Sequence, residues 1–228
     1  MKAVILAGGF GKRLMPLTES IPKALVKVGG RPILYWELKW LKSHGITDIV
    51  ILAGNMASKI VEYTNSMGYD ARIQFSIESR PVGSAGALKK AYSLLKDEEM
   101  FLLLNGDNIT DYDISRLKLP GWALCCLSLK PYRSRSGIAQ VKGDRVTYFR
   151  EKPIIEGYWN NADINLVSSK LLRSLPKEGT LVTDVFPALI KQKKLSCVRF
   201  TKGYHRAVDT FKDYQEIDSD LKAGKVKI

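Results

Sequence analysis

The chain has 228 residues, of which 45% are hydrophobic, so it is long enough for one well-buried domain but cramped for two. No apolar run approaches the about 20 residues that a membrane helix needs, so we expect no membrane partner. The formal net charge of +13 suits an anionic substrate, and the absence of a basic run with interleaved aromatic residues argues against nucleic acid as the partner.

The first element predicted along the chain is a short apolar strand, residues 3–6, that runs into glycine-rich backbone. Three glycines within residues 8–11 leave the peptide N–H groups free to approach an anion closely. Arg13 and Lys23 follow, and both can add charge-assisted hydrogen bonds to phosphate oxygens. We therefore predict a loop that binds a polyphosphate. The strand is too short, and too soon followed by glycines, to be a signal peptide, so we expect a cytoplasmic protein.

Two other phosphate-binding loops do not fit this stretch. A P-loop needs Ser or Thr after its Gly-Lys pair, and here Gly11-Lys12 is followed by Arg13. A dinucleotide-binding fingerprint usually has a third glycine where Leu14 stands. The remaining alternative is a tight strand-to-helix turn without a ligand, which leaves the flanking cations unexplained.

Helical and extended apolar spacings then alternate along the first half of the chain. They predict helices over 32–44, 57–67 and 85–95 and strands over 48–53, 71–77 and 100–104. Gly45 is a good C-cap for the first of these helices. Strands that alternate with helices indicate a mainly parallel sheet covered on both faces, so the predicted fold class is α/β and Rossmann-like.

In the second half of the chain the regular alternation of strands and helices ends, and the pattern predicts a mixed sheet with a small antiparallel element. Strands are expected over 123–129, 138–141 and 145–149, with a hairpin turn between the last two, and helices over 183–193 and 212–223. Cys125 and Cys126 are neighbours in a strand and point to opposite faces, so they do not bridge or chelate a metal as a pair. We expect all three cysteines, including Cys197, to be buried, unreactive thiols. We assign residues 1–228 to a single domain whose two halves divide near residue 120.

One carboxylate directly follows a buried strand. Asp107 comes after the apolar run 100–104, at a carboxyl end of the sheet, where open α/β sheets place their ligands. A carboxylate there can hold Mg²⁺, which takes one or two carboxylates and fills its other positions with phosphate oxygens and water. Asp111 and Asp113 are interpreted instead as turn and cap residues.

Four motifs in order resemble the sugar-1-phosphate nucleotidyltransferases, in the short form without a C-terminal β-helix domain. They are Leu-Ala-Gly-Gly-Phe-Gly-Lys-Arg-Leu at 6–14, Pro-Lys-Ala-Leu at 22–25, Pro-Val-Gly-Ser-Ala-Gly-Ala-Leu at 81–88 and Glu-Lys-Pro at 151–153. The resemblance implies transfer of a nucleotidyl group from an NTP to a sugar 1-phosphate, giving an NDP-sugar and pyrophosphate. It also implies Mg²⁺ as the cofactor, and a homodimer is common in the family.

The resemblance further implies roles for individual residues. Arg13, Lys23 and Lys152 would be catalytic, and Asp107 and Asp209 would hold the metal ion. The nucleotide would contact Leu6, Ala7, Gly8, Gly9, Gly11, Glu78, Gly83 and Ser84, with Glu78 at the base edge. The sugar would contact Asn105, Gly106, Glu151 and Asn161. In another alignment register the second metal aspartate falls on Ala207, and Asp209 would then be the N-cap of the helix that follows.

The C-terminal half departs from the family pattern at two positions that bear on the sugar. Asp163 stands where many relatives have a glycine, and Leu181 stands where some have a sugar-binding glutamate. The sequence therefore leaves the nucleobase and the sugar open. It also leaves two other functions open, a non-catalytic sensor of sugar nucleotides and a nucleotidyltransferase acting on a non-sugar phosphate. His44 and His205 are interpreted as structural or surface residues.

Overall fold

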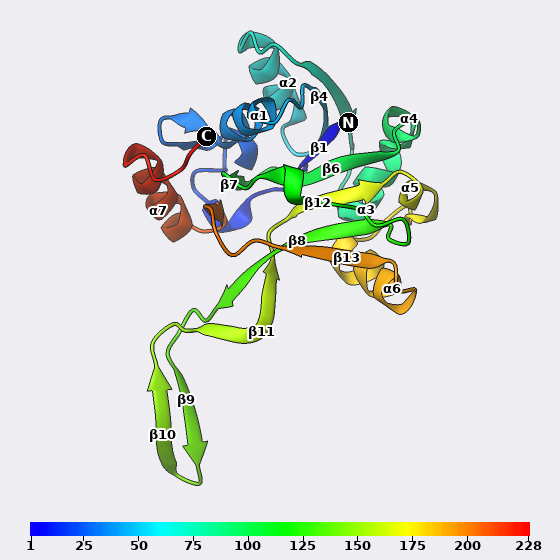
Figure 1. The fold of residues 1–228 in the computed structure, drawn as a ribbon. Helices are drawn as coiled ribbons and strands as arrows, with labels where there is room; N and C mark the ends of the chain where they lie inside the picture. The colour runs from blue at the N-terminus through cyan, green and yellow to red at the C-terminus, as the bar shows by residue number, and fades with distance from the viewer.

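A twisted sheet of eight strands forms the centre of the molecule, which a computed structural model describes over residues 1–228 (Figure 1). The strand order is β11-β8-β12-β6-β1-β4-β5, and β13 also pairs with β8. The strands are β1 (Ala3–Ala7), β4 (Asp48–Ala53), β5 (Arg72–Ile77), β6 (Met100–Asn105), β8 (Cys125–Arg133), β11 (Ile154–Asn161), β12 (Ile164–Ser168) and β13 (Leu195–Arg199).

The sheet is parallel in the first half of the chain and mixed in the second. β5, β4, β1 and β6 run parallel to one another, whereas β12 pairs antiparallel with both β6 and β8. Because β12 lies directly beside β6, the two halves of the chain share one hydrogen-bonded sheet. This arrangement confirms the predicted α/β class with a mainly parallel mixed sheet.

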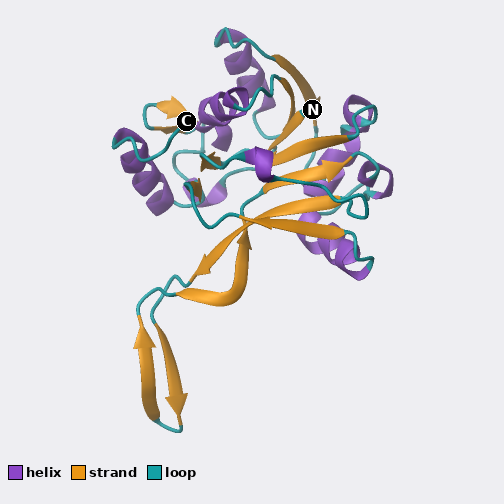
Figure 2. Ribbon diagram, viewed as in Figure 1, coloured by secondary structure: helices purple, strands orange, loops and turns teal.

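Helices cover both faces of this sheet (Figure 2). The helices are α1 (Ile33–Ser43), α2 (Ala57–Ser66), α3 (Gly83–Lys90), α4 (Tyr92–Leu95), α5 (Leu171–Ser174), α6 (Phe186–Lys191) and α7 (Phe211–Lys222). Alternate residues of β1 belong to opposite cores: Ile5 packs with Leu38 of α1, and Val4 packs with Leu88 of α3. The two-residue period of a strand thus divides the apolar side chains between two helical layers.

The adjacent cysteines follow the same alternation. Cys126 belongs to the core under α1 and α2, and Cys125 to the core under α3, so the two thiols lie on opposite faces as predicted. Burial raises the pKa of the Cys125 thiol to about 12, which keeps it protonated and unreactive. Cys197 on β13 is exposed, which corrects the expectation that all three thiols are buried.

Two predicted helices differ from the structure in their details. The predicted helix 85–95 is divided at Ala91, whose ψ of 8° separates α3 from α4. The predicted helix 183–193 begins with a π-helical turn, Leu181–Val185, before α6. Pro187 lies in the first turn of α6, where its missing N–H costs no hydrogen bond.

Two small antiparallel pairs lie beside the main sheet. β7 (Asn108–Thr110) pairs with β14 (His205–Ala207), and β2 (Lys27–Val28) pairs with β3 (Arg31–Pro32). The β7–β14 pair brings the C-terminal segment next to the end of β6, and α7 then packs on β14 and β2. Asp107 directly precedes β7 and Asp209 follows β14, so the pairing of the two strands brings these aspartates near each other.

A hairpin of β9 (Ile138–Lys142) and β10 (Arg145–Arg150) extends away from the body of the molecule (Figure 1). All of its strand residues are exposed. Gly143 forms the predicted turn with a φ of +59°.

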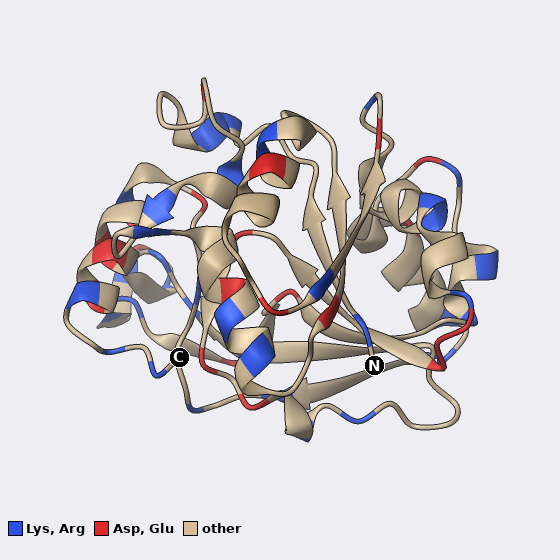
Figure 3. Ribbon diagram, turned by 90° about the horizontal axis from the view of Figure 1, so that it is seen from above, with Lys and Arg blue, Asp and Glu red and all other residues tan.

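Lys and Arg positions are distributed around the periphery on both sides of the sheet (Figure 3). None of the helices is long and apolar enough to cross a membrane.

Candidate active site

The glycine-rich loop leaves the carboxyl end of β1 and turns sharply at Gly11. Gly11 has a φ of +64°, and a Cβ there would lie 2.9 Å from Cγ2 of Thr18. The hydroxyl of Thr18 donates a hydrogen bond of 2.9 Å to the Gly11 carbonyl and fixes this turn. A single 3₁₀ turn, Lys12–Leu14, follows and carries Arg13. Gly11 therefore supplies a backbone conformation that a larger residue would adopt only with strain.

A cavity of about 290 Å³ opens above this loop, and we call it the catalytic cavity. Its lining comes from the loop, from the end of β6 and from the segment after β14. Many of the predicted catalytic, nucleotide-binding and metal-binding residues line it, together with two predicted sugar-binding residues, Asn105 and Gly106. The others are Leu6, Ala7, Gly9, Gly11, Arg13, Lys23, Asp107 and Asp209.

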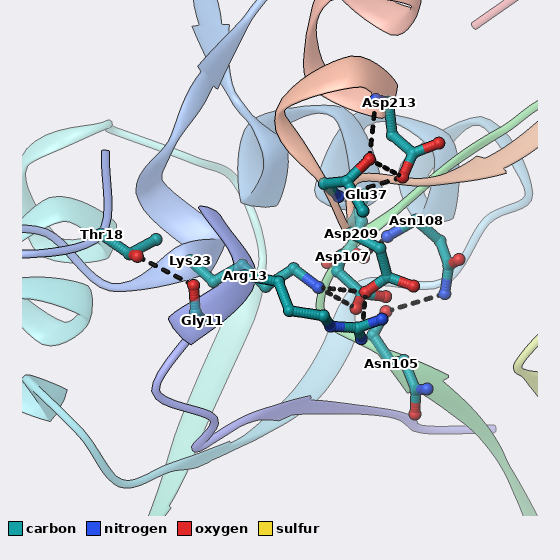
Figure 4. A network of polar contacts seen from close by, with 11 residues as sticks. Gly11, Arg13, Thr18, Lys23, Glu37, Asn105, Asp107, Asn108, Asp209 and Asp213 are labelled. Atoms are coloured by element: carbon teal, nitrogen blue, oxygen red, sulfur yellow. Dashed lines mark hydrogen bonds and ion pairs between the residues drawn. The ribbon is translucent and has the colours of Figure 1, made fainter. Parts of the chain in front are cut away.

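Four charged side chains form one network in this cavity (Figure 4). The Lys23 ammonium donates hydrogen bonds of 2.6 Å to Oδ2 of Asp107 and 2.9 Å to Oδ1 of Asp209. Arg13 donates a further bond of 2.9 Å to the same oxygen of Asp209. Residues from three distant stretches of sequence thus meet at one point.

The β7–β14 pair places Asp209 beside Asp107. The N–H of Val208 donates a hydrogen bond of 2.9 Å to the carbonyl of Asp107, which ties the two segments together next to the carboxylates. The N-cap of α7 is Thr210, which forms a capping box with Asp213. The alternative role of Asp209 as the cap is therefore wrong, and its side chain is free to bind the two cations.

The charges of the network balance one another. Burial opposes the charge of Lys23, yet Asp107 and Asp209 raise the pKa of its ammonium above the usual value. Burial raises the pKa of Asp107 even though Lys23 lies beside it. Burial also opposes ionisation of Asp209, but its hydrogen bond from Lys23 and the charges of Lys23 and Arg13 lower its pKa. Lys23 is therefore a firmly held cation at neutral pH.

The two aspartates have the chemistry of a magnesium site that needs a nucleotide for completion. Oδ1 of Asp107 is buried and has no hydrogen-bond partner. No group of three or more His, Cys, Asp or Glu residues lies close enough to hold a metal ion by itself. Two carboxylates without a complete protein cage fit Mg²⁺, because this ion is usually bound with phosphate oxygens and water.

A second cavity of about 280 Å³ adjoins the catalytic cavity at Leu6, Gly9 and Asn105, and we call it the nucleoside cavity. It is lined by Gly8, Gly9, Glu78, Gly83 and Ser84 among others, so the predicted nucleotide-binding residues of two separate segments meet there. Oε2 of Glu78 is buried without a hydrogen-bond partner.

The contacts at the start of α3 explain why Gly and Ser stand at positions 83 and 84, which line the nucleoside cavity. Gly83 has a φ of +78°, and a Cβ there would lie 2.2 Å from the carbonyl oxygen of Gly179. The Ser84 hydroxyl accepts a hydrogen bond of 2.9 Å from the N–H of Leu181. The helix therefore starts against the Gly179 segment, and only glycine fits at its first position.

A third cavity, also of about 280 Å³, adjoins the catalytic cavity at Asp209, and we call it the acceptor cavity. Lys130 lines it and bonds to His205, at 3.0 Å from Nδ1 and 3.3 Å from the carbonyl oxygen. Burial lowers the pKa of His205 to about 3, so its ring is neutral. His205 also stacks on Tyr112, with ring centroids 5.4 Å apart, which agrees with the predicted structural role.

The predicted sugar-binding residues are divided among the catalytic cavity, the acceptor cavity and the base of the hairpin. Asn105 and Gly106 line the catalytic cavity, and Asn161 lines the acceptor cavity. Glu151 and the predicted catalytic residue Lys152 line none of the three cavities, and their side chains are 63% and 53% exposed. Lys152 Nζ lies 3.4 Å from Oε1 of Glu151, and Arg133 holds the Lys152 carbonyl with a hydrogen bond of 3.0 Å. Their roles toward the acceptor remain predictions.

Sequence reasoning missed several polar residues that line or support the site. Lys130 and Arg135 line the acceptor cavity, and no short motif marks them in the sequence. Glu37 is fully buried on α1, and its Oε1 accepts a hydrogen bond of 3.1 Å from the N–H of Asn108, next to Asp107. A glutamate among the apolar residues of a helix is the only available signal, and it does not show what the residue faces.

Comparisons with known proteins identify the family of this chain. The sequence pattern of the nucleotidyl transferase family matches residues 2–224. Mannose-1-phosphate guanyltransferase of Aspergillus oryzae (strain ATCC 42149 / RIB 40) is 35% identical over 210 residues, which cover 86% of this chain and 57% of the relative. The enzyme of the same name from Candida albicans (strain SC5314 / ATCC MYA-2876) is 34% identical over 229 residues, which cover 94% and 62%. The chain thus spans less than two thirds of these relatives.

The fold is shared with solved structures. HddC from Yersinia pseudotuberculosis, solved in complex with GMP-PN, superimposes with a TM-score of 0.75 and 25% identity, covering 97% of this chain and 99% of that one. A glucose-1-phosphate thymidylyltransferase assigned as putative, from Bacillus anthracis, gives a TM-score of 0.76 at 23% identity, covering 97% and 95%, and this likeness concerns the fold alone. The chain belongs to the nucleotidyl transferase family, which confirms the resemblance seen in its motifs.

Proposed function

We propose that this protein transfers a guanylyl group from GTP to mannose 1-phosphate or a closely similar sugar 1-phosphate, releasing pyrophosphate. The observation that carries the proposal is the catalytic cavity, where Arg13, Lys23, Asp107 and Asp209 meet at the glycine-rich loop. The names of the relatives from A. oryzae and C. albicans, both mannose-1-phosphate guanyltransferases, support the choice of base and sugar.

The proposed reaction is an in-line displacement at the α-phosphorus of GTP. A phosphate oxygen of the acceptor forms the new bond, the bond from the α-phosphorus to the bridging oxygen of the β-phosphate breaks, and pyrophosphate leaves with that electron pair. The attacking oxygen is already anionic at neutral pH, so no general base is required. The protein must instead align two anions and neutralise their charge.

The cations of the catalytic cavity suit that task. Arg13 is 69% exposed at the mouth of the cavity, so it can reach an α-phosphate or a departing pyrophosphate. Lys23 is held deeper, between the two aspartates, and can bond to a phosphate oxygen on the same side. Asp107 and Asp209 would hold Mg²⁺, which when bound neutralises phosphate charge and orients the triphosphate. Glycine N–H groups of residues 8–11 would complete the phosphate contacts.

Glu78 in the nucleoside cavity supports the choice of guanine over uracil or thymine. Guanine presents two adjacent donors on one edge, its N1–H and its N2 amino group, and a carboxylate offers two acceptor oxygens. Glu78 lines this cavity and has an oxygen without a partner. Uracil and thymine present one N–H between two carbonyl oxygens, which a carboxylate would repel. Glu78 is thus proposed to select GTP.

The acceptor cavity would hold the sugar, so the part of the chain after about residue 120 would supply most acceptor contacts. Lys130 and Arg135 line this cavity and would attract the acceptor phosphate. Asp209 belongs to both the acceptor and the catalytic cavities, which places the acceptor next to the proposed reaction centre. Lys152 and Glu151 are proposed to close on the acceptor from the base of the hairpin.

The test is pyrophosphate release from purified protein with each NTP and a panel of sugar 1-phosphates and phosphocholine. We expect the highest kcat/KM for GTP with mannose 1-phosphate, and we expect Glu78→Gln to reduce the preference for GTP over UTP by about 10- to 100-fold. The exposed Glu62→Gln is the matched control and should leave this preference unchanged. Absence of turnover with every pair, together with tight binding of an NDP-sugar, would instead support the sensor.

A further inference from the structure

Asp163 combines three features that a structural aspartate rarely has together. It connects β11 to β12 with a φ of +55°, a backbone conformation that glycine adopts far more readily. It lines the acceptor cavity. It also has no ion-pair partner, because the nearby Lys130 bonds to His205 instead. Strain of this kind persists where the surrounding structure over-determines it, often at a binding site.

The surroundings hold this aspartate in one orientation. Asn161 donates a hydrogen bond of 2.7 Å from Nδ2 to Oδ1 of Asp163, and the N–H of Asp163 donates one of 3.1 Å to Oδ1 of Asn161. The carbonyl of Asp163 accepts a bond of 3.2 Å from the N–H of Asn105, a residue of the catalytic cavity. Oδ1 is thereby occupied, whereas Oδ2 receives no hydrogen bond from the protein.

The electrostatic environment makes an unpaired carboxylate costly at this position. Burial, together with the charges of Asp107 and Asp209, raises the pKa of Asp163 to about 6. Asp163 does not complete a metal site with these two, since no three acidic residues lie close enough to hold an ion. A ligand that donates hydrogen bonds to Oδ2 would supply what the protein does not.

We propose that Asp163 determines acceptor specificity by accepting a hydrogen bond from a ring hydroxyl of the sugar 1-phosphate through its free Oδ2. The inference rests on the proposed function, because it needs the acceptor to bind beside Asp209. The recognised chemistry is a polyhydroxylated phosphate monoester. A site that is built to bond one hydroxyl rejects the analogue that lacks it, because the buried acceptor is then left unpaired.

The experiment pairs two variants of Asp163 with a series of monodeoxy sugar 1-phosphates. Asp163→Gly removes the carboxylate and fits the positive φ, so the fold is retained. Asp163→Asn retains the shape and tolerates this backbone conformation. The matched control is Lys193→Gly, which relieves the same kind of strain at a residue with a φ of +56° that lies on the surface after α6.

We expect Asp163→Gly to lower kcat/KM for the parent acceptor by about 10- to 100-fold while KM for GTP stays unchanged. One deoxy analogue should be a poor substrate of the wild type and equally poor for Asp163→Gly, because the variant and the analogue lose the same hydrogen bond. Lys193→Gly should discriminate among the acceptors as the wild type does.

Two negative results have different meanings. If the wild type turns over no sugar 1-phosphate, the proposed function is wrong and this inference falls with it. If the wild type discriminates among the deoxy analogues and Asp163→Gly discriminates in the same way, the proposed function stands and the role of Asp163 is wrong. If Asp163→Gly lowers kcat/KM equally for every deoxy analogue, the role of Asp163 is also wrong, since that result indicates a general distortion of the cavity.

Discussion

Replacing Lys23 by methionine should destabilise the fold and make its stability depend on Mg²⁺. The Lys23 ammonium bonds both Asp107 and Asp209, and the side chains of Lys23 and Asp107 are only 17% and 19% exposed. Removing one partner of a buried ion pair costs about 3–5 kcal/mol. We take the lower end, about 3 kcal/mol, because the raised pKa of Asp107 lets that carboxyl take up a proton in the variant.

The measurement is thermal unfolding of the wild type and Lys23→Met between pH 5 and pH 8. For a domain of this size, 3 kcal/mol corresponds to a fall in Tm of about 6–12 °C. The fall should be largest at pH 8 and should shrink as the pH is lowered, because protonation removes the repulsion between Asp107 and Asp209. Millimolar Mg²⁺ should raise the Tm of the variant more than that of the wild type, where Lys23 already occupies the place between the carboxylates.

The control is Lys89→Met. Lys89 also bonds two oxygens, the carbonyls of Leu172 and Arg173 at 2.9 and 2.8 Å, but no carboxylate. Its replacement should lower Tm without any dependence on Mg²⁺. The reasoning is refuted if Lys23→Met melts within about 2 °C of the wild type at pH 8, or if Mg²⁺ shifts both proteins equally.

Three further predictions concern catalysis, pH and the hairpin. Arg13→Ala should lower kcat by about 10²–10³-fold, measured as pyrophosphate release, while Tm stays the same because the side chain is exposed; an unchanged kcat would contradict its role. Folding raises the pKa of Asp163 from 3.8 to about 6, so the free energy of unfolding should fall as pH rises through this range, by about 3 kcal/mol. Asp163→Asn, followed by chemical denaturation against pH, should lack that fall, and an identical pH profile would count against the shift. Lys152→Ala should raise KM for the acceptor but not for GTP in steady-state kinetics, and equal effects on both would remove Lys152 from the acceptor site.

Local sequence patterns were sufficient for most of the fold. Residues 48–53 form a short, almost continuous apolar run, as a buried strand does, and the structure has β4 over the same six residues. Gly11 and Gly83 have φ values of +64° and +78°, and the glycines in the sequence already indicated this backbone conformation. The division of the helix 85–95 at Ala91 was not visible, because its residues favour a helix throughout.

The order of the motifs predicted the chemistry of the site but not its assembly. The glycine-rich loop, the carboxylate after β6 and the segments at 81–88 and 151–153 each carry their chemistry in short runs of sequence. One uncertainty at Asp209 was decided by contacts instead, because Thr210 makes the cap of α7. The side chain of Asp209 bonds Lys23, which lies 186 residues away, and its role toward a metal ion stays a prediction.

The sequence by itself determined an α/β fold, a glycine-rich loop followed by cations and an aspartate at a strand end, because each of these depends on neighbouring residues and their spacing. Only the tertiary structure decided that Lys23 joins Asp107 to Asp209, that Lys130 bonds His205, and that Asp163 stands unpaired in the adjoining cavity. These arrangements depend on the antiparallel pairing of β7 with β14 and of β12 with β6. Such pairings are set by packing of the whole chain, so no local pattern specifies which polar side chains they bring together.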